Sequence, residues 1–203
     1  AGDDPAGIGL FLVERAAAQV RGYPTQDGAR AAEVVFAQAP AALIVEQGYP
    51  TLEKAVDVGI AALAAEAVGV MDRYVALTVE YMNTRKQFGV AIATFQALRH
   101  RMADIKMQLE LARSMSYFAT LKLGEPAPQR RRAISQAGVQ LGQSMRFVGQ
   151  QCVQLHGGIG ITDEYQGSHF FKRLTVLEMT FGDTQHHIGE VAARLQDTAG
   201  VFA

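Results

Sequence analysis

Apolar residues recur every three or four positions over most of the chain after residue 50, which is the spacing of one buried face of an α-helix. This spacing predicts helices at about 52–85, 94–122 and 128–154, then a short amphipathic segment near 162–171 and a last helix at about 173–196. Long amphipathic helices with short connections are typical of an antiparallel bundle. We therefore expect a mainly α fold, an antiparallel four-helix bundle.

The beginning of the chain has a different pattern. Runs of aromatic, aliphatic and other β-compatible residues at 8–15, 30–37 and 41–46 predict three short strands. Three short strands make a poor independent unit, so they resemble the end of a sheet whose other strands are absent. The sequence therefore predicts two domains: the last strands of a β-domain in 1–50, and the helical bundle in 51–203.

The connection between the first two predicted helices contains Arg85, Lys86, Gln87, Phe88 and Gly89. Glycine takes a left-handed cap conformation without steric cost, so we expect Gly89 to end the first helix. Arg85 and Lys86 would then lie in its last turn, where cations oppose the negative end of the helix dipole. On residue chemistry alone, this connection is a well-capped helical hairpin.

Composition and charge exclude several function classes. The formal net charge is -1, which gives no basic field for nucleic acid or an anionic membrane, and we expect the cluster Arg130–Arg132 to be a solvated helix start. No apolar run reaches membrane-spanning length, and we expect no signal peptide. The single cysteine, Cys152, allows no internal disulfide, which fits a reducing cytoplasm. Cys152 lies on an apolar helical stripe, so we expect it in the core.

A glycine-rich loop follows the third predicted helix at Gly157, Gly158 and Gly160. Such a loop lets backbone amides approach a phosphate or carbonyl closely. No strand precedes it, so it is not a dinucleotide-binding fingerprint. No zinc-like spacing and no cysteine pair accompany the histidines, so we expect no metal site. The histidines considered were His156, His169, His186 and His187.

Two stretches carry a family resemblance. Arg85–Gly89, followed by Phe95-Gln96 and Met102-Ala103-Asp104, resembles a signature of the acyl-CoA dehydrogenase C-terminal domain. Gln154–Thr162 resembles the other C-terminal signature of that family, and the resemblance covers nearly the whole chain. It implies an FAD-dependent oxidoreductase that desaturates an acyl-CoA thioester. In that reaction a carboxylate takes the α-proton while a hydride passes from the β-carbon to the flavin.

The resemblance also implies which residues contact FAD, across a subunit interface. The residue types suit this role, because Arg85 can pair with pyrophosphate oxygens and Phe88 can pack against an aromatic ring. Gln96 and Gln154 can each donate or accept a hydrogen bond. The implied contacts are Arg85, Gln87, Phe88, Ile92, Phe95, Gln96, Gln154, Leu155, Gly157, Gly158 and Thr184.

The catalytic base is the point where this chain departs from the family. The family places a glutamate at one of two positions, and the matching residues here are Gly182 and Gly59. Glycine cannot accept a proton. Asp183 and Asp57 lie next to these positions, but each is displaced and has a shorter side chain than glutamate.

With glycine at both base positions, the sequence resembles the small subunit of pimeloyl-CoA-dehydrogenase-type enzymes. It is also similar to the non-catalytic subunits of heteromeric acyl-CoA dehydrogenases acting on steroid side chains, where two subunits share the flavin and one supplies the base. The resemblance implies an acyl-CoA substrate, an electron-transfer flavoprotein or similar acceptor, and a tetramer with identical or paralogous subunits. Two alternatives stay open: a self-sufficient homotetramer using Asp183 or Asp57, and a non-catalytic helical interaction module.

Overall fold

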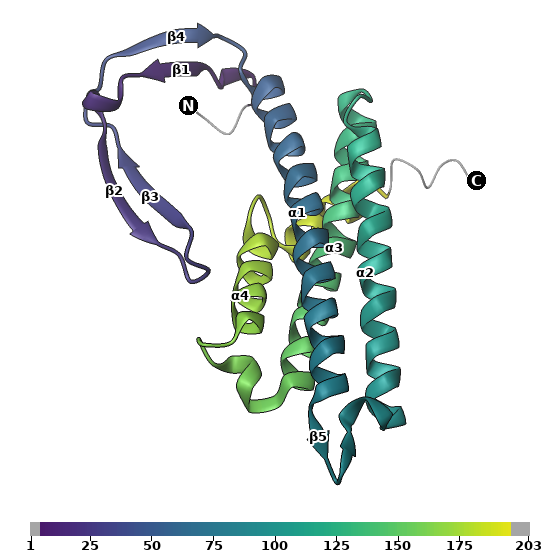
Figure 1. Ribbon diagram of the computed structural model, residues 1–203. Helices are drawn as coiled ribbons and strands as arrows, with labels where there is room; N and C mark the ends of the chain where they lie inside the picture. Colours follow the sequence, from purple (N-terminus) through teal and green to yellow (C-terminus); the bar gives the residue numbers. More distant parts are fainter. Residues whose placement is uncertain (1–4, 196–203) are drawn as a thin grey trace, which may run out of the picture. The chain divides into compact units, whose positions relative to one another are not determined.

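The computed structural model describes residues 5–195, and the chain divides into two compact units between Val56 and Asp57 (Figure 1). In the first unit, β1 (Leu10–Val13) pairs antiparallel with β4 (Ala41–Val45). Strand β2 (Gln19–Pro24) pairs antiparallel with β3 (Arg30–Val35). Strands β1, β3 and β4 correspond to the three predicted runs, and β2 was missed.

The strands of the first unit leave large apolar side chains exposed. Phe11, Leu12, Leu43 and Ile44 are each exposed by half or more. Two separate two-stranded ladders supply no second layer to cover such side chains. Such exposure is what an incomplete sheet would leave. The assignment of this segment to a β-domain stays a prediction.

The helices form the predicted antiparallel bundle, which lies in the second unit except for the first eight residues of the first helix. The first, α1 (Tyr49–Thr84), is followed by α2 (Gln96–Lys122) and α3 (Ala127–His156), and successive helices run in opposite directions (Figure 1). Two shorter helices complete the unit, α4 (Gln166–Met179) and α5 (Thr184–Ala193). Short 3-10 helices occupy Pro5–Gly7, Arg15–Ala17, Ile92–Thr94 and Gly157–Ile161.

The predicted apolar stripes form the core of the bundle. Each long helix turns one periodic face inward, and the side chains on these faces are almost fully buried. Cys152 is one of them, as predicted, and its burial raises the pKa of the thiol to about 12. The residues fully buried with the largest side chains include Met71, Tyr74, Ile105, Leu109, Ile134, Val148 and Leu174.

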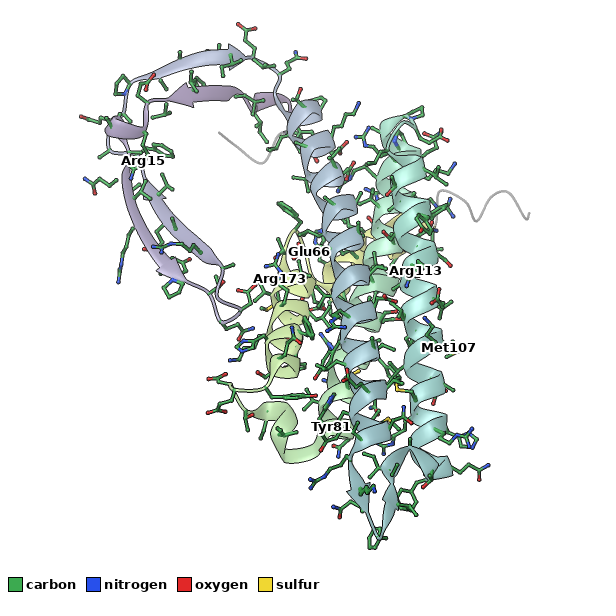
Figure 2. The ribbon with its side chains drawn as sticks, in the orientation of Figure 1. Arg15, Glu66, Tyr81, Met107, Arg113 and Arg173 are labelled. Atoms are coloured by element: carbon green, nitrogen blue, oxygen red, sulfur yellow. The ribbon has the colours of Figure 1, made fainter. Side chains whose placement is uncertain are left out.

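Ion pairs on the bundle surface join neighbouring helices. Arg113 of α2 places Nη2 2.9 Å from Oδ1 of Asp72 on α1. Arg173 of α4 places Nε 2.6 Å from Oε1 of Glu66 on α1 (Figure 2). No helix within residues 5–195 has both the length and the apolar character needed to cross a membrane.

The prediction of one last helix at 173–196 is wrong. The chain leaves the helical conformation between α4 and α5, where Phe181 has φ 60° and Gly182 has φ 104°. Both values lie outside the right-handed helical region, and Gly182 adopts its positive φ readily because it has no Cβ. The second half of the amphipathic segment predicted near 162–171 is the beginning of α4, which starts at Gln166. Residue 196, at the end of the predicted helix, lies outside the described residues.

Candidate functional site

The signature stretch after α1 forms a β-hairpin. Strands β5 (Lys86–Gln87) and β6 (Val90–Ala91) pair antiparallel, and Ile92 N–H donates to the Arg85 carbonyl at 2.9 Å. The prediction that Gly89 ends α1 is therefore wrong, since the helix stops at Thr84. Gly89 has the expected positive φ, 81°, but uses it in the hairpin turn beside Phe88, whose φ is 53°.

The hairpin presents its polar and aromatic side chains to solvent. Arg85 and Gln87 are exposed, and Phe88 at the turn is 92% exposed. The Phe95 ring meets the Phe88 ring edge-on, with centroids 6.1 Å apart. Ile92 is buried and anchors the hairpin to the bundle. Gln96, the first residue of α2, is exposed on the same connection.

The second signature forms the end of α3 and the loop after it. Gly157 has φ 66°, and its N–H donates to the carbonyls of Gln154 and Val153. A Cβ placed on Gly157 or Gly158 would meet no other atom within 4 Å, so the loop backbone is open to an approaching group. Gln154 is exposed, whereas Leu155 is buried and holds the end of α3 in the core.

The fold brings the hairpin and the glycine loop to the same end of the bundle. Tyr81 lies one helical turn before Arg85, and His156 immediately precedes Gly157. The rings of Tyr81 and His156 have centroids 4.6 Å apart, with Tyr81 near the hairpin end of α1 (Figure 2). We call this end, formed by the hairpin and the glycine loop, the hairpin end.

Sequence analysis missed the aromatic residues that join the two signatures. Tyr74, Tyr81 and Tyr165 surround His156, with Tyr165 contributed by the segment before α4. The periodic pattern of the helix predicted at about 52–85 includes Tyr74 and Tyr81, but gives them no role beyond its buried face. Their spacing of seven residues places them on one helix face, but contact with a distant histidine has no sequence signal.

The residues at the hairpin end suit a ligand with phosphates and an aromatic ring. The Arg85 guanidinium forms no ion pair with any residue in the described range, so its charge is free for an anion. The open Gly157 and Gly158 backbone and the exposed Phe88 ring supply the other features that FAD requires. All of these groups face solvent, so a flavin held there needs further covering surface.

Thr184 does not join this set. It is buried on α5. Its hydroxyl oxygen packs against Gly142 of α3 so closely that a Cβ on Gly142 would lie only 2.1 Å from it. At 1.5 Å per residue, Gly142 and His156 are about 20 Å apart along α3. The Thr184 hydroxyl donates to Glu178 Oε1 at 2.7 Å, which gives it an internal partner instead.

The two positions where the family has a glutamate are connected through the side chain of Phe181. A Cβ on Gly59 of α1 would lie 2.8 Å from Cε2 of Phe181, the residue next to Gly182. A Cβ on Gly182 would lie 2.4 Å from Cδ2 of His186. The ring of Phe181 thus covers Gly59, and neither position offers a carboxylate.

Asp183 has a structural role. Its Oδ1 accepts a hydrogen bond from His186 N–H at 2.8 Å and so caps the N-terminus of α5. Glu178, which sequence analysis did not single out, accepts from the Thr184 N–H at 3.2 Å as well as from its hydroxyl. These carboxylates together satisfy the first turn of α5.

Asp57 is also committed to a structural interaction. It is fully buried, with Oδ2 2.6 Å from Arg130 Nε and Oδ1 3.2 Å from Arg131 Nη1. The prediction that Arg130–Arg132 is a solvated helix start is therefore wrong for Arg130, which is only 6% exposed. An aspartate enclosed by two guanidinium groups cannot reach a substrate, which argues against Asp57 as a base.

Comparisons with known proteins point to one family. The family profile described as acyl-CoA dehydrogenase, C-terminal domain, matches residues 46–196. The acyl-CoA dehydrogenase IpdE2 of Mycobacterium tuberculosis is 39% identical over 111 residues, covering 55% of this chain and 33% of that protein. IpdE2 of Mycolicibacterium smegmatis is 33% identical over 150 residues, covering 74% of this chain and 44% of that protein.

Solved structures share the fold. A variant of the steroid ACAD Tcur3481-Tcur3483 superposes with a TM-score of 0.85 at 25% identity, covering 95% of this chain and 53% of that one. Butyryl-CoA dehydrogenase from Megasphaera elsdenii gives a TM-score of 0.83 at 24% identity, covering 96% and 53%. The chain thus spans between a third and about half of the length of the proteins it matches here. The family profile matches about three quarters of the chain, which therefore belongs to the acyl-CoA dehydrogenase family through the C-terminal domain.

Proposed function

We propose that this chain is part of an FAD-dependent acyl-CoA dehydrogenase, and that it is the subunit without a catalytic base in a heteromeric enzyme. The observation that carries the proposal is the pair of glycines, Gly59 and Gly182, at the two base positions. Neither offers a carboxylate, while the residues suited to FAD remain available at the hairpin end. A self-sufficient enzyme would need a carboxylate at one of these positions.

Each residue of the hairpin end has a role in this proposal. Arg85 holds the flavin pyrophosphate through charge-assisted hydrogen bonds, and Phe88 packs against an aromatic ring of the cofactor. The Gly157 and Gly158 backbone approaches polar oxygens that a side chain would exclude. When bound, FAD accepts the hydride from the β-carbon of the acyl thioester, while a carboxylate takes the α-proton.

The comparisons support a partner subunit and an electron acceptor. One neighbour of the same fold is described as the ChsE4-ChsE5 complex from Mycobacterium tuberculosis, and the steroid ACAD carries a paired name. A relative 29% identical, from Acetobacterium woodii, is named as subunit CarC of a caffeyl-CoA reductase-Etf complex. We infer a paralogous partner subunit, an electron-transfer flavoprotein or similar acceptor, and a reducing, cytoplasmic setting for the single thiol of Cys152.

Substitution of Arg85 tests the flavin site. Arg85→Ala is expected to weaken FAD retention by roughly tenfold or more, because a hydrogen bond to a charged group contributes about 1.5–3 kcal/mol. Lys86→Ala is the matched control: it removes a neighbouring exposed cation that matches no flavin contact of the family. The measurement is FAD affinity by fluorescence titration of the complete protein. Equal losses in both variants would contradict the assignment of Arg85.

The outer face of α2 supports association. Met107, Leu111 and Leu121 are exposed by 53%, 42% and 79%, and on a helical projection Leu111 and Leu121 lie about 40° to either side of Met107. Met107 points away from the bundle in Figure 2. Exposed apolar residues gathered on one face are typical of a protein-protein interface. We infer that another helical bundle covers this face.

Light scattering tests the association. We expect an oligomer with an interface beyond about 1,000 Å². Leu111→Glu should shift it toward smaller species, because a charge is costly to bury in an apolar contact. Gln129→Glu, which places the same charge on the exposed start of α3, should leave the assembly unchanged. A monodisperse monomer before any substitution would overturn the prediction.

A further inference from the structure

His156 is enclosed by aromatic side chains at the hairpin end. It is 3% exposed, and ring centroids of Tyr81, Tyr165 and Tyr74 lie 4.6, 5.0 and 6.0 Å from its own. Tyr74 and Tyr81 come from α1, and Tyr165 comes from the segment before α4. The histidine thus holds the end of α3 against two other parts of the bundle.

The hydrogen bond of His156 defines its tautomer. Nδ1 lies 2.8 Å from the carbonyl oxygen of Cys152, and a carbonyl only accepts, so Nδ1 carries the proton. Burial lowers the pKa of His156, which favours the neutral ring. In a neutral ring with Nδ1 protonated, Nε2 is a hydrogen-bond acceptor. This Nε2 is buried and has no hydrogen-bond partner among residues 5–195.

Tyr74 presents the complementary group. Its side chain is fully buried, and its hydroxyl has no hydrogen-bond partner in the described part of the chain. The ring is nearly parallel to that of His156, with an interplanar angle of 22°. A buried donor and a buried acceptor, both unpaired, therefore occupy two neighbouring rings. Leaving such groups unpaired is unfavourable, so a state that joins them is stabilised.

The position of His156 connects this pair to the loop. It is the last residue of α3, and Gly157 follows directly with φ 66°. A Cβ on Gly157 or Gly158 would touch no other atom. Other elements therefore do not pack against these glycines on the side where a side chain would be. The loop backbone is therefore free to shift together with His156, the residue from which it starts.

We propose that the Tyr74 hydroxyl donates a hydrogen bond to His156 Nε2 when FAD is bound, and that His156 is thereby a positioning residue for the Gly157–Gly158 loop. This inference rests on the proposed function, because it assigns the loop to the flavin. His156 acts through the glycines next to it and does not itself contact the reacting atoms. Tyr74 stabilises the position of the loop that fits the cofactor.

Tyr74→Phe separates this role from simple packing, because it removes only the hydroxyl. In the flavin-free protein the substitution should leave the denaturation midpoint unchanged or raise it, since the lost group was buried and unpaired. FAD affinity should fall roughly two- to tenfold, which corresponds to one net hydrogen bond. These opposite effects, on chemical denaturation of the apoprotein and on fluorescence titration of FAD, would not arise from a packing role.

Two further variants control the experiment. Tyr117→Phe makes the same change on an exposed ring of α2, outside the aromatic cluster, and should leave FAD affinity unchanged. His156→Asn keeps a side-chain N–H able to replace Nδ1 and removes Nε2. It should weaken FAD binding, and adding Tyr74→Phe to it should cause no further loss.

The outcomes distinguish this inference from the proposed function. Unchanged FAD affinity in Tyr74→Phe, with the expected loss in Arg85→Ala, would overturn the role of the Tyr74–His156 pair and leave the flavin site standing. A lower denaturation midpoint of the Tyr74→Phe apoprotein would also overturn it, because the bond would already exist without FAD. A complete protein that binds no FAD would overturn the proposed function, and this inference with it.

Discussion

Asp183→Asn is expected to leave the rate of flavin reduction by an acyl-CoA unchanged in the assembled enzyme. Asp183 is displaced by one residue from the base position and its Oδ1 caps α5. A displacement near 1 Å can already reduce a rate ~100-fold, so a shorter, displaced carboxylate is a poor substitute for glutamate. Asparagine keeps the capping oxygen, so the variant should fold normally. Anaerobic flavin reduction followed by absorbance measures the effect.

The same assay on this chain without its partner should show no reduction. Gly59 and Gly182 offer no proton acceptor, so in the proposed heteromeric enzyme the base comes from the paralogous subunit. Adding that subunit should restore reduction, and replacing its base carboxylate should abolish it. Rapid reduction by the purified chain alone, lost in Asp183→Asn, would instead establish a self-sufficient enzyme.

The second large effect concerns stability. Asp57→Ala should lower the free energy of unfolding by about 3–5 kcal/mol, because it removes a fully buried carboxylate that is paired with two guanidinium groups, one of them the buried Arg130. Arg131, the other partner of Asp57, retains a contact with Glu190 at 3.4 Å. For a protein of this size the loss corresponds to a fall in Tm on the order of 10 °C. Thermal and chemical denaturation followed by circular dichroism measure it.

Asp72→Ala is the matched control for Asp57→Ala. Asp72 pairs with Arg113 at 2.9 Å across the surface of α1 and α2, with its side chain 56% exposed. Solvent screens such a pair, so its loss should cost about 1 kcal/mol or less. Equal effects of the two substitutions would show that the Asp57 pair is no more important to stability than a surface pair.

The sequence by itself determined the bundle and much of the candidate site. Helix periodicity predicted α1, α2 and α3 because one face of each must be apolar to be buried. It also predicted the burial of Cys152, since a stripe at helical spacing defines the core side. The two signatures identified Arg85 and Gly157 as residues of interest, because their letters and order are specific. The absence of a carboxylate at positions 59 and 182 is a direct property of the sequence.

Only the tertiary structure decided which of these residues meet. The presence of glycine at position 89 could not distinguish a helix cap from a hairpin turn, because both use positive φ. The break at Phe181 and Gly182 follows from backbone conformations that an apolar pattern does not encode. A charge cluster at a helix start is usually solvated, and only the packing of α1 against α3 brings Arg130 to Asp57. The contact between Tyr74 and His156 likewise exists because the fold brings two distant helix faces together, so no local pattern could predict it.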